Sequence, residues 1–426
     1  MPKTASVGPA TGSRRVIVAA SLVSFIEGYD ALLFGYFATI LSEQFFPGGD
    51  STAALLNTFA IFAVGFAMRP LGAILFGYVG DGFGRVHALI SSVLVMVVAT
   101  LGIGLLPTYQ AVGAWAPALL LACRLLQGLS VGGEYVGANI LILEHAPEGR
   151  SGRWVSANLV GGYLGISAAG AAGLVLAKVL SPADLTAWGW RLPFFAAVPL
   201  AVVALYMRLH ITDGPAFTAA RERRRDFPLG AVFRLASRGM LAFAAWFAMA
   251  GLGAYLLIGY LASYLTKVVG MTQAEAFAAN LVAVLTLTVG ALSGGYLVDR
   301  YSPRTVGVFC ACGVALVAVP GFLVVQRGTM ATTILGQIPL AFCLGIAGTV
   351  GAALSVSLFP AEVRYTAAGF AYSVASTLFG SSAPYVSTWL IARTGSPTAP
   401  AWYLEGMAVV GVTVAMLMLG PQAEGS

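Results

Sequence analysis

The chain has 426 residues, of which 58% are hydrophobic and only 9% are charged, and its formal net charge is +6. A soluble domain carries roughly a quarter charged residues, so this composition excludes an ordinary water-soluble fold. The basic excess does not indicate nucleic-acid binding, because Lys and Arg stand in short clusters between apolar runs, as they do in the cytoplasmic loops of membrane proteins.

Twelve long apolar runs follow one another along the chain. A membrane-spanning helix needs about 20 such residues, whereas the strands of a membrane β-barrel would be shorter and would alternate. The sequence therefore predicts an all-α integral membrane protein with twelve transmembrane helices. The runs cover residues 16–41, 53–79, 88–106, 114–143, 155–176, 192–209, 240–265, 276–298, 305–325, 331–358, 367–392 and 401–419.

The first run and the loop charges set the expected orientation. The run is too long for the apolar part of a signal peptide and holds two acids, so it is predicted to remain as the first helix. Most Lys and Arg residues, including the cluster Arg221–Arg225, fall in loops on the side of both termini. The positive-inside rule then predicts a multi-pass protein of the cell membrane with both termini in the cytoplasm.

Loop motifs repeat between the two halves of the chain. Gly77–Arg85 follows the second run and Gly295–Arg304 follows the eighth, while Arg150 and Arg364 close the loops after the fourth and tenth runs. Such duplication predicts two pseudo-symmetric six-helix bundles, an architecture of transporters. We expect an N-terminal bundle at residues 1–212, a cytoplasmic linker at 213–239 and a C-terminal bundle at 240–426.

Few ionisable residues lie within the runs, and such residues usually face a cavity or a partner. Glu27 and Asp30 share one face of the first helix, and a carboxylate in a low-dielectric setting binds protons more readily. Both are candidate proton carriers, Asp30 the preferred one; the alternative is a structural pair with a neighbouring cation. Glu134 is a third candidate, with a structural pair to Arg69 or a backbone group as its alternative.

Arg124 and Arg69 are the buried cations. Arg124 offers a planar fork suited to a carboxylate, either from a substrate or from Asp30. Arg69 precedes Pro70 and could contact substrate or satisfy a carbonyl freed by the proline. In the second half, Tyr260, Gln337 and Tyr372 are candidate substrate-binding residues, although tyrosines in membrane proteins are more often packing or interfacial residues.

The four cysteines carry no predicted chemistry. Cys123, Cys310, Cys312 and Cys343 all lie inside apolar runs, where they are interpreted as small buried side chains. We expect no metal site and no cofactor.

The loop Gly77–Arg85 resembles the signature of the major facilitator superfamily between its second and third helices. Gly82 and Val86 depart from it, since basic residues are usual there. Arg124–Gly128 resembles the fourth-helix signature of the same superfamily. By this resemblance, five residues in the cytoplasmic turns form a gating charge network; the alternative is that they only set topology. They are Asp81, Arg85, Asp299, Arg300 and Arg304.

Further matches resemble the metabolite:proton symporter family, which includes citrate and tricarboxylate, α-ketoglutarate, shikimate and proline/betaine carriers. They run along nearly the whole chain in the family's order, and Leu33–Thr39 is most similar to the citrate and tricarboxylate carriers. The other matching segments are Glu27–Asp30, Arg69–Gly72, Gly132–Glu134, Asp213–Phe217 and Val363–Thr366.

These observations together predict a secondary transporter rather than an enzyme. The preferred hypothesis is proton-coupled uptake of a small organic anion, such as a di- or tricarboxylate, by alternating access of two bundles around a central site. The alternative is proton-coupled uptake of a zwitterionic osmolyte such as proline or betaine. The sequence contains no motif typical of a membrane enzyme, and the duplicated halves argue against a channel. The expected partners are the substrate, protons and the lipid bilayer, with no nucleic acid, and a monomer is expected.

Overall fold

The computed structural model describes residues 9–83, 85–130, 134–144, 146–210, 229–360 and 363–417. It is 89% helical, and these ranges contain no β-strand. The all-α prediction is therefore confirmed.

Each of the first six predicted runs corresponds to one helix or to two helices in series. The first run is divided at Phe37 and the second at Met68, whereas residues 131–133 of the fourth run lie outside the described residues. The helices are α1 (Pro9–Tyr36), α2 (Ala38–Phe45), α3 (Ser51–Ala67), α4 (Arg69–Phe83), α5 (Arg85–Leu105), α6 (Tyr109–Val112), α7 (Trp115–Ser130), α8 (Glu134–Glu144), α9 (Ser151–Val179), α10 (Pro182–Ala187), η1 (Gly189–Arg191) and α11 (Leu192–His210).

The second six runs follow the same pattern, and two of them contain π-helical segments. The elements are α13 (Leu229–Tyr255), η2 (Leu256–Tyr260), α14 (Leu261–Tyr264), η3 (Leu265–Val269), α15 (Gln273–Arg300), α16 (Pro303–Val325), α17 (Met330–Ser357), α18 (Arg364–Ala375), η4 (Ser376–Ser381), α19 (Ala383–Thr394) and α20 (Ala399–Leu417). Helix α13 begins within the segment 213–239 that was expected to be linker, and residues 211–228 lie outside the described residues.

The helix ends follow from local sequence. Asp50 caps α3 by accepting hydrogen bonds from the backbone N–H groups of Thr52 and Ala53 at 2.8 and 3.2 Å, since these first N–H groups lack partners within the helix. Thr272 and Glu275 form a capping box at the start of α15. The series ending in η3 stops at Gly270, whose φ of 84° few other residues adopt.

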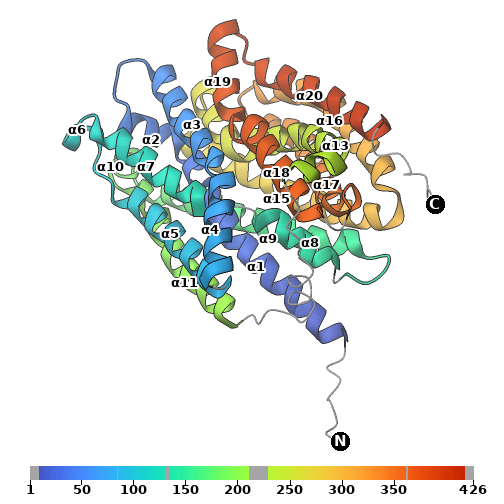
Figure 1. Cartoon of the computed structure of the whole chain (residues 1–426). Helices are drawn as coiled ribbons and strands as arrows, with labels where there is room; N and C mark the ends of the chain where they lie inside the picture. Colours follow the sequence, from blue (N-terminus) through green and yellow to red (C-terminus); the bar gives the residue numbers. More distant parts are fainter. Residues whose placement is uncertain are drawn as a thin grey trace, which may run out of the picture.

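The helices form two groups that correspond to the two halves of the sequence. In Figure 1 the blue-to-green elements α1–α11 occupy one side and the yellow-to-red elements α13–α20 the other. Within the first half, α1 packs on α9 and α5 on α11; within the second, α15 packs on α17 and α16 on α20. Across the boundary, α9 packs on α15 and α1 on η2.

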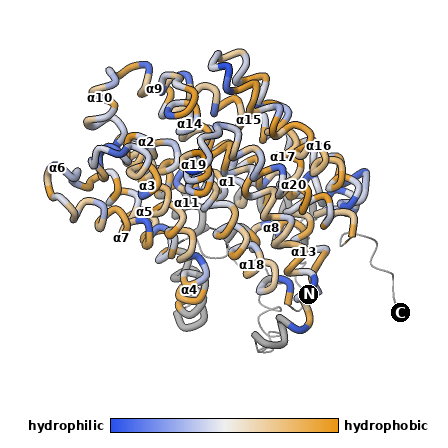
Figure 2. Tube along the Cα trace, turned by 90° about the horizontal axis from the view of Figure 1, so that it is seen from above, coloured by the Kyte–Doolittle hydropathy of each residue, from blue (hydrophilic) through white to orange (hydrophobic). Residues whose placement is uncertain are grey.

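The outer faces of these helices are apolar. Seven described helices are long and apolar enough to cross a membrane, by length and composition. Large side chains such as Val98, Leu316 and Leu335 are 62%, 74% and 71% exposed, and hydrophobic colour runs along most of the helices in Figure 2. Apolar surface of this extent fits contact with lipid rather than with water.

Candidate functional site

The carboxylate of Asp30 lies in the last third of α1 and is almost fully buried, with 3% of the residue exposed. The Thr100 hydroxyl of α5 donates a hydrogen bond to one carboxylate oxygen, Oδ1. The Gln127 amide of α7 donates to the other oxygen, Oδ2, at 2.8 Å and to the Thr100 hydroxyl at 2.9 Å. Three helices of the first half thus converge on one acid.

The Arg124 guanidinium is equally buried, at 3% exposure, one turn from Gln127 on α7. Its Nη1 donates to the side-chain amide oxygen of Gln127, Oε1, at 2.5 Å. Its Nη2 lies 3.4 Å from the backbone oxygen of Phe62. Its Nε has no hydrogen-bond partner among the described residues. The described part of the chain also holds no direct ion pair between Arg124 and Asp30, because the amide of Gln127 lies between them.

Aromatic rings surround the same guanidinium. The central carbon of Arg124 lies 4.7 Å from the ring centroid of Phe34 and 4.9 Å from that of Phe62. The electron-rich faces of such rings attract cations. Helix α3 can approach α7 this closely because Gly65 lies against Arg124, whose backbone oxygen would be 3.0 Å from an added Cβ.

Arg69 joins the two halves. It stands at the start of α4, with its guanidinium 4.0 Å from the ring centroid of Phe66. It also donates hydrogen bonds to the hydroxyls of Tyr255 on α13 and Tyr372 on α18. Glu27, half-buried on α1, is close enough to interact electrostatically with Tyr372. The predicted residues Glu27, Arg69 and Tyr372 are therefore brought together at the contact of the halves.

The other predicted residues of the second half are tied to protein partners. The ring of Tyr260 packs on that of Phe59 with centroids 5.9 Å apart, and its hydroxyl hydrogen-bonds with that of Thr388. The Gln337 amide donates to the backbone oxygen of Ala279 at 2.6 Å. The Gln337 contact links two helices of one half, and the Tyr260–Phe59 contact joins the halves by packing.

At one end of the molecule the two halves are joined by Asp299, at the C-terminal end of α15. Its carboxylate accepts hydrogen bonds from the backbone N–H groups of Gly152 at 2.6 Å and Arg153 at 3.3 Å, at the start of α9. The Arg153 side chain adds an ion pair at 2.7 Å. The helices meet closely here, since a Cβ added to Gly152 would lie 2.5 Å from the Gly295 oxygen. We call this group the Asp299 latch.

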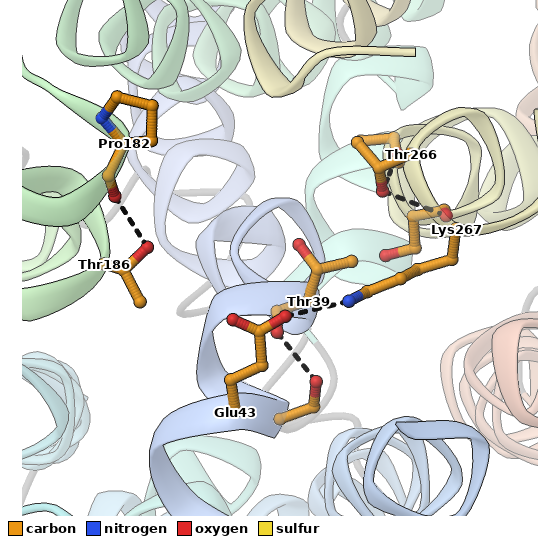
Figure 3. A network of polar contacts seen from close by, with 9 residues as sticks. Thr39, Glu43, Pro182, Thr186, Thr266 and Lys267 are labelled. Carbon is orange, nitrogen blue, oxygen red and sulfur yellow. Dashed lines mark hydrogen bonds and ion pairs between the residues drawn. The ribbon is translucent and has the colours of Figure 1, made fainter. Parts of the chain in front are cut away.

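At the opposite end the two halves are joined by Glu43 and Lys267, which we call the Glu43 latch. Figure 3 shows the Glu43 carboxylate of α2 facing the Lys267 ammonium of η3. Oε1 of Glu43 lies 2.8 Å from Nζ of Lys267. Nearby, Gly35 of α1 faces Gly259 of η2, whose Cα would be 3.1 Å from a Cβ added at Gly35. The halves are therefore in contact at both ends of the molecule.

The remaining gating candidates divide into two groups. Arg300 lies 3.4 Å from the Tyr296 hydroxyl, and Arg304 donates to the backbone oxygen of Met416 at 2.7 Å, so both contact their own half. The side chains of Asp81, Arg85 and Glu134 lie outside what the structure describes.

Several polar residues of these sites are absent from the sequence-based predictions. Gln127 and Thr100 are neutral, and only charged residues and second-half polar residues were considered there. A usable signal existed, because Gln127 is a buried amide one helical turn from Arg124 in an apolar run. Glu43 and Lys267 had no such signal, since they lie on helical segments that are far apart in the sequence.

A small cavity of about 10 Å³ adjoins Asp30 and Thr100 between α1, α5 and α11, at the lower limit for one water molecule. Among the described residues, no group of three His, Cys, Asp or Glu side chains is placed to hold a metal ion.

The fold is shared with solved transporter structures. The D-xylose-proton symporter superposes with a TM-score of 0.74 at 18% identity, covering 94% of this chain and 96% of that one. The proton:xylose symporter XylE bound to 6-bromo-6-deoxy-D-glucose gives a TM-score of 0.76 at 17% identity, with 96% of each chain covered. The chain therefore shares the fold of these membrane-embedded, multi-pass transporters.

Relatives in sequence identify the family of transporters to which the chain belongs. The proline/betaine transporter of Escherichia coli (strain K12) is 31% identical over 95% of this chain and 83% of its own length. The glycine betaine/proline/ectoine/pipecolic acid transporter OusA of Dickeya dadantii is 32% identical over the same shares. The family model described as "Sugar (and other) transporter" matches residues 16–227. The chain belongs to the major facilitator superfamily, in the metabolite:proton symporter family that includes the proline/betaine carriers, and its relatives are transporters rather than enzymes.

Proposed function

We propose that this protein is a proton-coupled uptake carrier for a small zwitterionic osmolyte such as proline or betaine. This substrate was the alternative hypothesis from sequence, and the organic anion was the preferred one. The order is now reversed, because the relatives with 31% and 32% identity are transporters of proline, betaine and related osmolytes.

The observation that carries the proposal is the surroundings of Arg124. A zwitterion presents a carboxylate and a cation a few ångströms apart. The buried guanidinium, whose Nε has no partner among the described residues, can receive the carboxylate. The rings of Phe34 and Phe62 now hold the Arg124 guanidinium, and they can hold the substrate cation once the guanidinium turns toward the carboxylate. One compact group of side chains therefore matches both ends of the substrate.

The charge balance at the centre supports the same class of substrate. The described ionisable residues there are two cations, Arg69 and Arg124, and two acids, Glu27 and Asp30. With the acids charged, these contributions cancel. A neutral zwitterion adds no net charge to this site, whereas a tricarboxylate would bring about three negative charges to two arginines whose charge the two acids already balance.

The proposed transport cycle uses both latches. The substrate enters while the Glu43 latch is open, the halves close around it, and the Asp299 latch then opens for release. Asp30 takes up a proton with the substrate and loses it on the other side, and Glu27 and Glu134 are further candidates. By the positive-inside rule the Asp299 latch faces the cytoplasm, as do both termini. A monomer contains all of these parts.

Uptake by the purified protein in liposomes tests the proposal. We expect saturable uptake of betaine and proline that increases with an inward proton gradient, and no competition from citrate. Saturable uptake of citrate without uptake of betaine would overturn the substrate assignment. Betaine uptake that ignores the proton gradient would overturn the coupling.

A further inference from the structure

Asp30 and Arg124 are linked by hydrogen bonds through the side chain of Gln127 rather than by direct contact. Its amide donates to Asp30 at 2.8 Å and to Thr100 at 2.9 Å, and its carbonyl oxygen accepts from Arg124 at 2.5 Å. All three side chains from Asp30 to Arg124 are at least 96% buried, so water does not weaken these hydrogen bonds.

This arrangement fixes the orientation of the amide while Asp30 is charged. The NH₂ group faces two acceptors and the oxygen faces a cation. Turning the amide over would place its oxygen against the carboxylate and its NH₂ group against the guanidinium, so that acceptor meets acceptor and donor meets donor. A charged Asp30 thereby keeps the Gln127 oxygen pointed at Arg124.

Protonation of Asp30 removes that constraint. A proton taken from water makes the carboxyl group neutral and turns one of its oxygens into a donor. On Oδ2 the new O–H faces the Gln127 NH₂ group, and the conflict is relieved when the amide turns its oxygen toward Asp30. On Oδ1 the O–H faces Thr100, and the loss of negative charge still weakens the hold on the amide. In both cases the Gln127 oxygen becomes a poorer acceptor for Arg124.

We infer that Gln127 is the positioning residue that couples the protonation of Asp30 to the availability of Arg124 for the carboxylate of the substrate. This inference rests on the proposed function, because it presupposes proton-coupled uptake of a carboxylate-bearing substrate. Its coupling element is a neutral amide, whereas a direct ion pair would need no intermediate residue.

Other ionisable groups lie near the hydrogen-bonded series of Asp30, Gln127 and Arg124 and interact with its charged members. Arg124 interacts with Arg69 and Tyr255, and Asp30 interacts with Tyr29 on its own helix. The test therefore changes only Gln127 and leaves these groups in place. Further out, Arg69 of α4 interacts with Tyr255 of α13 and Tyr372 of α18. Tyr372 interacts in turn with Glu27 of α1 and Tyr163 of α9.

The test is the pH dependence of KM for betaine uptake into liposomes, with betaine counterflow as a measure of exchange. In the parent protein we expect KM to fall as the outside becomes more acidic, by a factor of roughly 5 to 150, the usual range of coupling between two bound ligands. Gln127→Leu should still exchange betaine, but its KM should hardly vary with pH, and gradient-driven accumulation should be lost. An unchanged pH dependence in Gln127→Leu overturns the inference.

Two further variants keep the test decisive. Ser130→Ala removes a buried hydroxyl that donates to the backbone oxygen of Gln127 at 2.7 Å, on the same helix, and should retain the parent pH dependence. If Gln127→Leu fails to fold, Gln127→Met replaces it, because methionine has a similar length but no amide to link Asp30 with Arg124, and its KM should likewise hardly vary with pH. If the KM of the parent protein does not vary with pH, the proposed proton coupling itself is wrong. If KM varies with pH in both the parent and the Gln127 variants, only the role of Gln127 is wrong.

Discussion

The position of Arg124 depends on the packing of its planar guanidinium as much as on its charge. Its planar group lies against two phenylalanine rings and shares its hydrogen bonds between Gln127 and the backbone of Phe62. A lysine ammonium is a compact point charge that cannot reproduce this fork. The residue's function should therefore depend on the guanidinium itself.

Arg124→Lys should accordingly lower betaine uptake by at least about tenfold, in line with the loss of a charge-assisted hydrogen bond worth roughly 1.5–3 kcal/mol. Initial rates in liposomes measure the effect. Arg393→Lys, in the last turn of α19, is the matched control and should transport normally. A fully active Arg124→Lys protein would show that charge alone suffices.

Phe62 supplies an aromatic face to the same site, so Phe62→Leu should weaken the binding of the substrate cation while keeping an apolar side chain. A cation–aromatic contact contributes about 0.5–2 kcal/mol, which corresponds to roughly a 2- to 30-fold rise in Kd for betaine. Equilibrium binding to the detergent-purified protein measures it. Phe309→Leu, on the exposed face of α16, should leave Kd unchanged, and equal affinities for Phe62→Leu and the parent would contradict the prediction.

At the level of single residues, sequence reasoning found the charges but not their connections. Asp30 and Arg124 were recognisable because ionised groups are rare in apolar runs. Their link through Gln127 and Thr100 depends on the approach of α5 and α7 to α1, which no local pattern encodes. Asp30, one of the two carboxylates considered as a partner of Arg124, is linked to it through an amide rather than directly.

Among the elements, the π-helical segment η2 is notable because a buried side chain supports it. Asn280 of α15 donates to the backbone oxygen of Leu257 at 2.6 Å. A π-helical turn leaves backbone groups less well paired than an α-helix does, and such turns are frequent at functional sites. Asn280 thus compensates for the irregular backbone beside Tyr260.

Asn280→Leu should therefore destabilise the protein by about 1–3 kcal/mol, because it leaves a buried carbonyl without its donor. Thermal unfolding in detergent should show a lower Tm. Asn57→Leu, at an exposed position of α3, is the control and should unfold near the parent temperature. If both variants unfold together, η2 does not need this hydrogen bond.

The number and order of the helices were predictable from the apolar runs, and the structure confirms the all-α fold. The divisions inside the runs were harder to foresee. Pro70 gives a local reason for the break at Met68, since proline lacks a backbone donor. The π-helical segments η2, η3 and η4 have no comparable signal, because they arise from packing between helices.

For the whole molecule, the two latches differ in strength. The Asp299 carboxylate is 3% exposed and accepts two backbone hydrogen bonds at the positive end of a helix. Glu43 and Lys267 are 53% and 35% exposed, and an ion pair of that kind contributes about 0.2–1 kcal/mol. The Asp299 end should therefore be the more firmly closed.

Asp299→Asn and Glu43→Gln should shift the molecule in opposite directions, each toward the form open at its own end. The reaction of a single introduced cysteine at each end with a membrane-impermeant thiol reagent measures the shift. We expect the larger change for Asp299→Asn, since it loses the ion pair with Arg153 and the charge at the start of α9. Equal labelling of both variants and the parent would show that these latches do not set the conformation.

Closure at both ends has a consequence for the membrane that surrounds the protein. Because the latches can hold at the same time, one side need not open as the other shuts, and the barrier stays sealed between loading and release. A cell could then keep many copies in place under a steep ion gradient without draining it, and could leave the carrier idle whenever its cargo is scarce.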